Sequence, residues 1–130
     1  MTQVQFKDDY PIFTMTLAKN ETSLKTVSDI LEQLRSKIEM HPVATYIGLF
    51  NHYEHTSCLE NGEVAPEIID AQNILFCFGK ELLVPEVLAV RPRSIGIAER
   101  KDDFVISFLK APNPAANEAM TTWTESLRDQ

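Results

Sequence analysis

The stretch from His52 to Cys58 carries two of the three histidines and one of the two cysteines of the chain. Imidazole and thiolate are the ligands that zinc prefers, and neutral histidine also binds haem iron. We therefore consider His52, His55 and Cys58 as a zinc or haem site, with Glu54 or Cys77 as a further ligand. The alternative is that these residues are ordinary polar residues at the end of a strand.

Local geometry separates these two interpretations. On a helix, spacings of three residues would bring His52, His55 and Cys58 to one face. On a strand, His52 and Cys58 share a face and His55 points to the other side. Because residues 43–50 are rich in β-branched and aromatic side chains, the sequence predicts a strand that leads into the cluster. Joint ligation would then need a bend near Tyr53 and Glu54.

Cysteine catalysis is a second alternative for the same cluster. A nucleophilic cysteine needs its thiolate stabilised by a nearby cation or a helix N-terminus. Cys58 is predicted to be exposed with His55 close in sequence, whereas Cys77 lies in an apolar run and is predicted to be a buried thiol. One cysteine near one histidine is not a catalytic signature, so the sequence does not favour an enzyme and assigns no catalytic residue.

A second set of candidate residues is basic. Arg91 and Arg93 flank a proline at the entrance of a predicted strand, and Lys80 follows a glycine. Two guanidinium groups and an ammonium group can hold a carboxylate or a phosphate. The alternative is that these side chains are solvated or pair with glutamates such as Glu81 and Glu99. The glycine before Lys80 lacks the partner glycine of a phosphate-binding loop, so nucleotide hydrolysis is not supported.

Composition limits the possible functions. The length of 130 residues suits one α+β domain over residues 1–130 with a core of its own. Twelve basic residues are scattered among nineteen acidic ones, and the net charge of −7 argues against a nucleic-acid partner. No apolar run reaches the ~18 residues of a membrane helix, and residues 1–9 do not resemble a signal peptide. We expect a cytoplasmic protein with two free thiols and no membrane partner.

Hydrophobic periodicity predicts the elements that must position these residues. Apolar side chains from Leu24 to Ile38 recur every three or four positions and predict an amphipathic helix, which ends at His41 before Pro42. The remaining elements are strands at 10–18, 43–50, 73–78, 94–99 and 104–109, a helical turn at 67–72, a short helix at 81–90 and a helix from Ala116 to Leu127. The run at 73–78 is continuous enough to predict a central strand covered on both faces. The order β-α-β-β-α-β-β-α predicts an α+β fold: a mixed, mostly antiparallel sheet of about five strands with helices packed on it.

Several short motifs resemble the uncharacterised bacterial family known as domain of unknown function three-oh-two. Its Ile-Asp-His motif is similar to residues 49–52, its Phe-Gly-Asn-Pro motif to residues 76–80, its Leu-Pro-Leu-Arg motif to residues 90–93, and its Ser-Tyr-x-x-Pro motif to residues 107–112. The resemblance covers about residues 24–112. It implies a compact, often dimeric α/β domain with no established activity.

We therefore expect a small domain that binds an anionic ligand or a protein partner and self-associates as a homodimer. The predicted ligand pocket lies where the strand end at His52 meets Lys80, Arg91 and Arg93. In that pocket the histidine offers a hydrogen bond near neutral pH, and the basic residues hold the anionic group.

Overall fold

The computed structural model describes residues 1–129, which form six strands, three α-helices and two short 3-10 helices. In chain order the elements are β1 (Thr2–Phe6), β2 (Tyr10–Ala18), η1 (Lys19–Glu21), α1 (Val27–Met40), β3 (Thr45–Asn51), α2 (His52–Ser57), β4 (Asp70–Cys77), η2 (Pro85–Val90), β5 (Arg93–Glu99), β6 (Asp103–Leu109) and α3 (Pro114–Glu125). No helix of residues 1–129 is long and apolar enough to cross a membrane.

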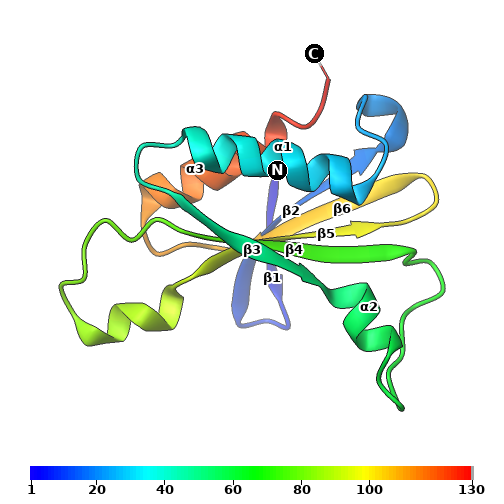
Figure 1. Ribbon diagram of the computed structural model, residues 1–130, viewed down its shortest axis with the longest axis horizontal. Coiled ribbons are helices and arrows are strands. Elements are labelled where there is room, and N and C mark those ends of the chain that lie inside the picture. Colours follow the sequence, from blue (N-terminus) through cyan, green and yellow to red (C-terminus); the bar gives the residue numbers. More distant parts are fainter. Residues whose placement is uncertain (130) are drawn as a thin grey trace.

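All six strands join one sheet in the order β1-β2-β6-β5-β4-β3, and each neighbouring pair is antiparallel. The α+β class is thus confirmed, with one strand more than the sequence predicts and no parallel pairing. Figure 1 shows α1 and α3 side by side on one face of this sheet. In the same view, η2 and α2 lie at opposite ends of the molecule, beyond the other face.

Helix α1 begins and ends where local chemistry predicts. The Thr26 hydroxyl accepts a hydrogen bond from the Asp29 backbone N–H (3.1 Å), and the Asp29 carboxylate accepts one from the Thr26 N–H (3.2 Å). This capping box satisfies two backbone donors at the start of the helix. The helix ends at Met40 because Pro42 disfavours helical geometry in the residue before it, His41.

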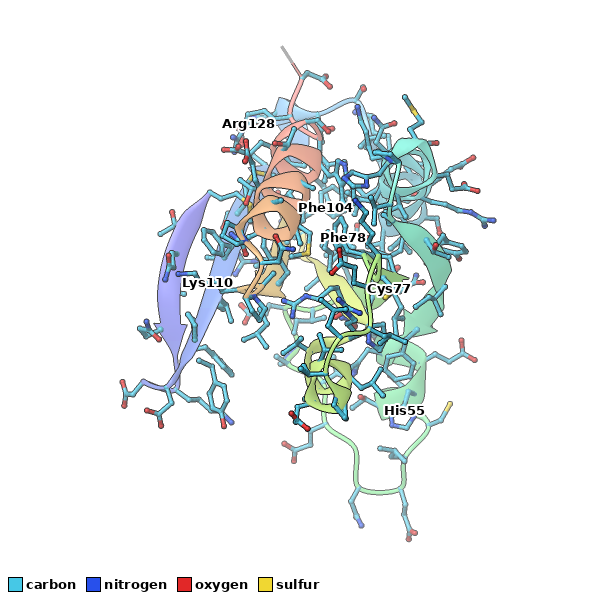
Figure 2. The ribbon with its side chains drawn as sticks, turned by 90° about the vertical axis from the view of Figure 1, so that its left-hand side faces the viewer. His55, Cys77, Phe78, Phe104, Lys110 and Arg128 are labelled. Atoms are coloured by element: carbon cyan, nitrogen blue, oxygen red, sulfur yellow. The ribbon has the colours of Figure 1, made fainter. Side chains whose placement is uncertain are left out.

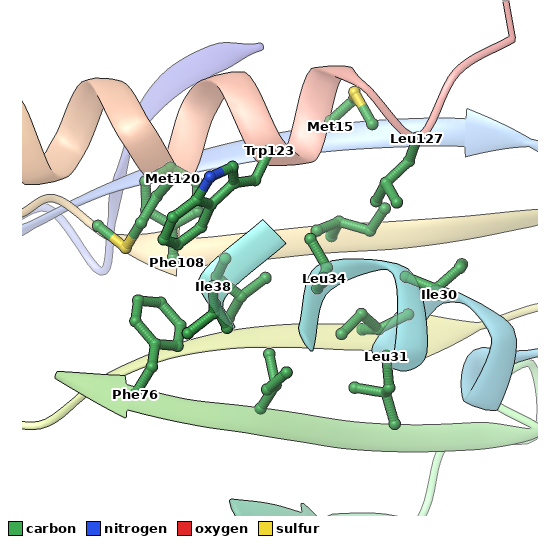
Figure 3. Close-up of a cluster of buried hydrophobic side chains, with 14 of the residues drawn as sticks. Met15, Ile30, Leu31, Leu34, Ile38, Phe76, Phe108, Met120, Trp123 and Leu127 are labelled. Atoms are coloured by element: carbon green, nitrogen blue, oxygen red, sulfur yellow. The ribbon is translucent and has the colours of Figure 1, made fainter. Parts of the chain in front are cut away.

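The core lies between the two long helices and the face of the sheet that they cover. Alternate strand residues supply one side of it, and they are Met15, Leu17, Ile74, Phe76, Ile95, Ile97, Phe104, Ile106 and Phe108. The helices supply the other side, with Ile30, Leu34 and Ile38 from α1 and Met120 and Trp123 from α3 (Figure 3). Each buried apolar side chain of this size contributes about 1.5–3 kcal/mol, so the alternation holds the helices on this face.

Within residues 1–129, no helix crosses the middle of the opposite face of the sheet. Helix α2 packs against Phe50 at one end of this face, and η2 lies beyond the other end (Figure 1 and Figure 2). The alternate residues that point to this face are Thr14 and Thr16 of β2, Val105, Ser107 and Leu109 of β6, Ser94, Gly96 and Ala98 of β5, Ala71, Asn73, Leu75 and Cys77 of β4, and Phe50 of β3. We call this surface the open face. These side chains are uncharged and at least partly exposed. Asp103, at the start of β6, points to the same side and pairs with Arg100.

Four local predictions are wrong. Strand β1 is absent from the prediction because its three-residue loop to β2 contains no glycine, although Lys7 and Asp8 adopt the positive φ values that glycine usually takes. Of the helical turn predicted at 67–72, residues 70–72 belong to β4 instead. The helix predicted at 81–90 shrinks to η2, which starts at Pro85. Strand β4 is covered on one face only, because α1 and α3 lie on the same side.

Candidate anion-binding site

The structure separates the residues of the predicted pocket. Asn51, just before His52, pairs with Gln72 at one end of β4, whereas Gly79 and Lys80 follow the other end. Seven residues of strand span about 23 Å, so His52 and the basic residues lie at opposite ends of the sheet. A pocket that combines His52 with Lys80, Arg91 and Arg93 is therefore not formed.

The histidine cluster forms a short helix instead of a strand end. Asn51 caps α2, its side-chain oxygen accepting from the Glu54 N–H at 2.9 Å. The rings of His52 and His55 lie 6.2 Å apart, and both pack against Phe50 at 5.4 and 5.5 Å between ring centres. His52 Nδ1 also lies 3.0 Å from the Thr56 hydroxyl. These contacts explain the cluster as aromatic and hydrogen-bonded packing on an exposed helix.

Cys58 is not brought into this cluster. Each step of three residues falls about 60° short of a full helical turn, so a residue six positions after His52 lies about 120° away from it. Cys58 sits at the C-cap of α2 and is exposed. Among residues 1–129, no group of three His, Cys, Asp or Glu side chains is placed to hold a metal ion. The geometry thus provides no ligand set for the zinc or haem hypothesis and no hydrogen bond from Cys58 to a histidine base.

Arg93 is the polar residue that stands out in the structure. It takes the first core-facing position of β5, in the same row as the buried Ile95 and Ile97, and is 8% exposed. Its two terminal nitrogens donate to the backbone carbonyls of Leu109 and of Val90, the latter at 3.4 Å. Its Nε is buried and has no hydrogen-bond partner within the described residues. Burial lowers the pKa of Arg93, because the charged form loses solvation there.

Arg91 is the second arginine of the site. One of its terminal nitrogens donates to the Glu81 carbonyl at 2.6 Å. Gly79 makes room for it, because a Cβ at that position would lie 3.4 Å from the same nitrogen and 3.0 Å from the Cys77 sulfur. No carboxylate of residues 1–129 lies within 4 Å of either Arg91 or Arg93, and Glu99 pairs with Lys19 instead.

A cavity of about 240 Å³ joins the two arginines. Its wall combines β5 with η2 and the start of α3, and it is lined by Phe78, Val87, Val90, Arg91, Arg93, Ala111, Pro112, Asn113 and Ala116. The Asn113 side chain caps α3 and accepts hydrogen bonds from the N–H groups of Ala115 and Ala116. The start of α3 therefore offers the cavity the positive end of the helix dipole, but these two N–H groups are already bonded. Lys80 is exposed and does not line this cavity.

A larger groove of about 370 Å³ between α1 and β3 contains no arginine that lacks an acidic partner. Its arginine, Arg35, pairs with Glu39 at 3.2 Å and stacks on Tyr46 at 4.1 Å from the ring centre. Because both cationic and aromatic groups are already satisfied, this groove gives a weaker reason to expect an anion.

The sequence pointed to Arg91 and Arg93 but not to their neighbours. Phe78, just after β4, and Asn113, the N-cap of α3, reach the cavity from segments that are distant in sequence and carry no motif. The sequence predicts only that a helix ends at His41. In the structure its Nδ1 also accepts hydrogen bonds from the N–H groups of Val43 and Ala44 at 3.1 and 3.2 Å. Its ring also packs edge-on against Phe78 and Trp123, behind the cavity wall.

The fold and this site define an α+β domain with a buried, unpaired arginine. Residues 1–129 match a family described as a family of unknown function, DUF6858, and the chain belongs to that family. No curated protein and no solved structure is similar enough to match the chain.

The family match corrects the resemblance inferred from the short motifs. The chain is a member of DUF6858, and no match to domain of unknown function three-oh-two is found. Motifs of three or four residues, in an order of strands and helices that many α+β domains share, do not distinguish one family from another.

Proposed function

We propose that this domain binds a small molecule with an anionic group, which Arg93 and Arg91 hold. The observation that carries the proposal is the buried guanidinium of Arg93, whose Nε has no acceptor and which has no carboxylate partner within the described residues. Buried charges in proteins are ordinarily paired, because an unpaired one costs several kcal/mol of lost solvation. A carboxylate or phosphate bound in the adjoining cavity would supply the missing negative charge beside Arg93.

The cavity limits the size and the shape of the ligand. A volume of about 240 Å³ equals that of about eight liquid waters and lies below the usual range for drug-sized ligands. Apart from the two arginines and Asn113, its lining is apolar. This combination favours a compact molecule with one anionic group and an apolar body, such as a small aromatic or branched carboxylate, over a sugar or a nucleotide.

Thermal unfolding in the presence of two probe anions tests the proposal. Sodium benzoate supplies a carboxylate with an apolar body, sodium phosphate supplies a phosphate group, and sodium chloride at equal ionic strength is the reference. At ten times its dissociation constant a ligand adds about 1.4 kcal/mol of stability, which for a chain of this size raises the midpoint by about 5 °C. We expect benzoate or phosphate to raise the midpoint of the wild-type protein, followed by calorimetric titration of the one that does.

Two matched arginine variants identify the site. Arg93→Met removes the charge from the cavity, whereas Arg35→Met removes one from the exposed side of α1. We expect the anion effect to disappear in Arg93→Met and to persist in Arg35→Met. Equal anion effects in both variants, or no effect of either anion on the wild-type protein, would contradict the proposal. A response to phosphate alone would assign a phosphate group, and a response to benzoate alone a carboxylate.

A further inference from the structure

The middle of the open face carries no charge across five neighbouring strands. One cross-strand row runs from Thr14 through Ser107, Gly96 and Asn73 to Phe50, over five neighbouring strands, without an ionisable side chain. Charged residues make up 24% of the chain. In an antiparallel sheet with one solvated face, polar residues normally point to the solvent and alternate along each strand with apolar residues that point to the core. A face built from small, uncharged and apolar residues departs from that pattern.

The side chains of the open face are graded in size. The middle of the row holds Ser107 and Gly96, while large apolar side chains stand toward the rims, with Phe50 40% and Leu109 48% exposed. Small residues at the centre leave room for a second sheet at the usual spacing of about 10 Å, between α2 at the Phe50 end and η2 at the Cys77 end. Beyond the Cys77 end, Ile47, Leu82 and Leu88 line, together with Arg91, a mostly apolar cavity of about 300 Å³ that borders this surface.

We infer that a second copy of this chain docks on the open face, so that two sheets pack face to face in a homodimer. A twofold interface places the same patch of each copy against itself. With a net charge of −7, two copies repel each other wherever their charged surfaces meet. Across the middle of the open face that repulsion is absent, because the facing residues there carry no charge.

The area of the open face is sufficient for such an interface. Five strands spaced about 4.8 Å apart, with about seven residues each, cover roughly 550 Å² of flat surface. Side-chain relief and the apolar residues beyond the rim raise the accessible area toward the roughly 800 Å² that each partner contributes to a standard stable interface. The proposal does not rest on the anion site, because Arg93 points to the helix-covered side of β5.

The mass of the protein in solution, measured by light scattering after size exclusion, tests the proposal. We expect the wild-type chain to have twice its monomer mass of 14.7 kDa at submillimolar concentration. Ser107→Glu places two carboxylates near each other at the centre of the interface and should weaken the dimer at least about 100-fold. Ser36→Glu adds the same charge on the exposed side of α1 and should leave the dimer unchanged.

A second variant keeps the test valid if glutamate at position 107 prevents folding. Thr16 is already exposed on the open face, so Thr16→Glu needs no repacking and should also give a monomer. Circular dichroism confirms that each variant is folded. A wild-type chain that remains monomeric would overturn the proposal and leave the face to a different protein. Folded Ser107→Glu and Thr16→Glu variants that remain dimeric would place the dimer interface elsewhere.

Discussion

Replacing Arg93 with methionine tests whether this arginine is kept for a ligand or for the fold. Methionine has a similar length and no polar atoms, so it can fill the space of the arginine stem in the row of Ile95 and Ile97. A residue retained for stability should be costly to replace by an apolar one. A residue retained for an anion should be cheap to replace in the absence of that anion.

The structure gives opposing terms of similar size for this substitution. Arg93→Met removes the hydrogen bonds to the Leu109 and Val90 carbonyls, which together are worth about 2–4 kcal/mol, since the donor is charged and one of them is long. It also removes a desolvated charge and a buried N–H without an acceptor, each of which costs about 1–3 kcal/mol or more. We therefore expect the free energy of unfolding to change by less than about 2 kcal/mol.

Urea unfolding of the wild-type protein, Arg93→Met and Arg93→Ala provides the measurement. Alanine removes the same polar groups and leaves a cavity as well, so Arg93→Ala should be about 2 kcal/mol less stable than Arg93→Met. If Arg93→Met is instead destabilised by more than about 4 kcal/mol, the two carbonyl bonds outweigh the cost of the buried charge. The arginine would then be a structural clamp, and the reasoning behind the anion site would fail.

Two further predictions concern the stability of the fold. Hydrogen bonding to Arg100 (2.7 and 2.9 Å) lowers the pKa of Asp103 in the folded protein. The stabilisation that this pair adds to folding is therefore complete above the ordinary aspartate pKa of about 3.9, and it is lost as the pH falls through the lower pKa of the folded state. Asp103→Asn should be less stable at neutral pH and lose less stability on acidification, as followed by urea unfolding; an unchanged pH slope would refute this. His41→Ala should lose about 2 kcal/mol because two backbone N–H groups lose their acceptor, and His41→Asn should lose less; equal losses in thermal unfolding would assign the effect to ring packing.

The candidate site could be predicted only in part from the sequence. The Arg-Pro-Arg segment at residues 91–93 was recognisable as a possible anion binder, because two guanidinium groups close in sequence stay close in any fold. The burial of Arg93 was not predictable, since it depends on α3 and η2 closing over the start of β5. The histidines were misplaced because Asn51 caps a helix at a point where the preceding residues continue a strand pattern.

Local patterns in the sequence by themselves determined which side of each element faces the core. Apolar residues two positions apart, such as Met15 and Leu17, indicate strands with one face in the core. Apolar residues three and four positions apart in α1 indicate an amphipathic helix that packs on such a sheet. Only the tertiary structure decided which ends of the strands meet and which face stays uncovered. Antiparallel pairing placed Asn51 and His52 at the end of β4 that lies about 23 Å of strand away from Gly79. The packing of both long helices on one side left the middle of the open face uncovered. Such outcomes depend on contacts between residues far apart in the chain, which no local pattern contains.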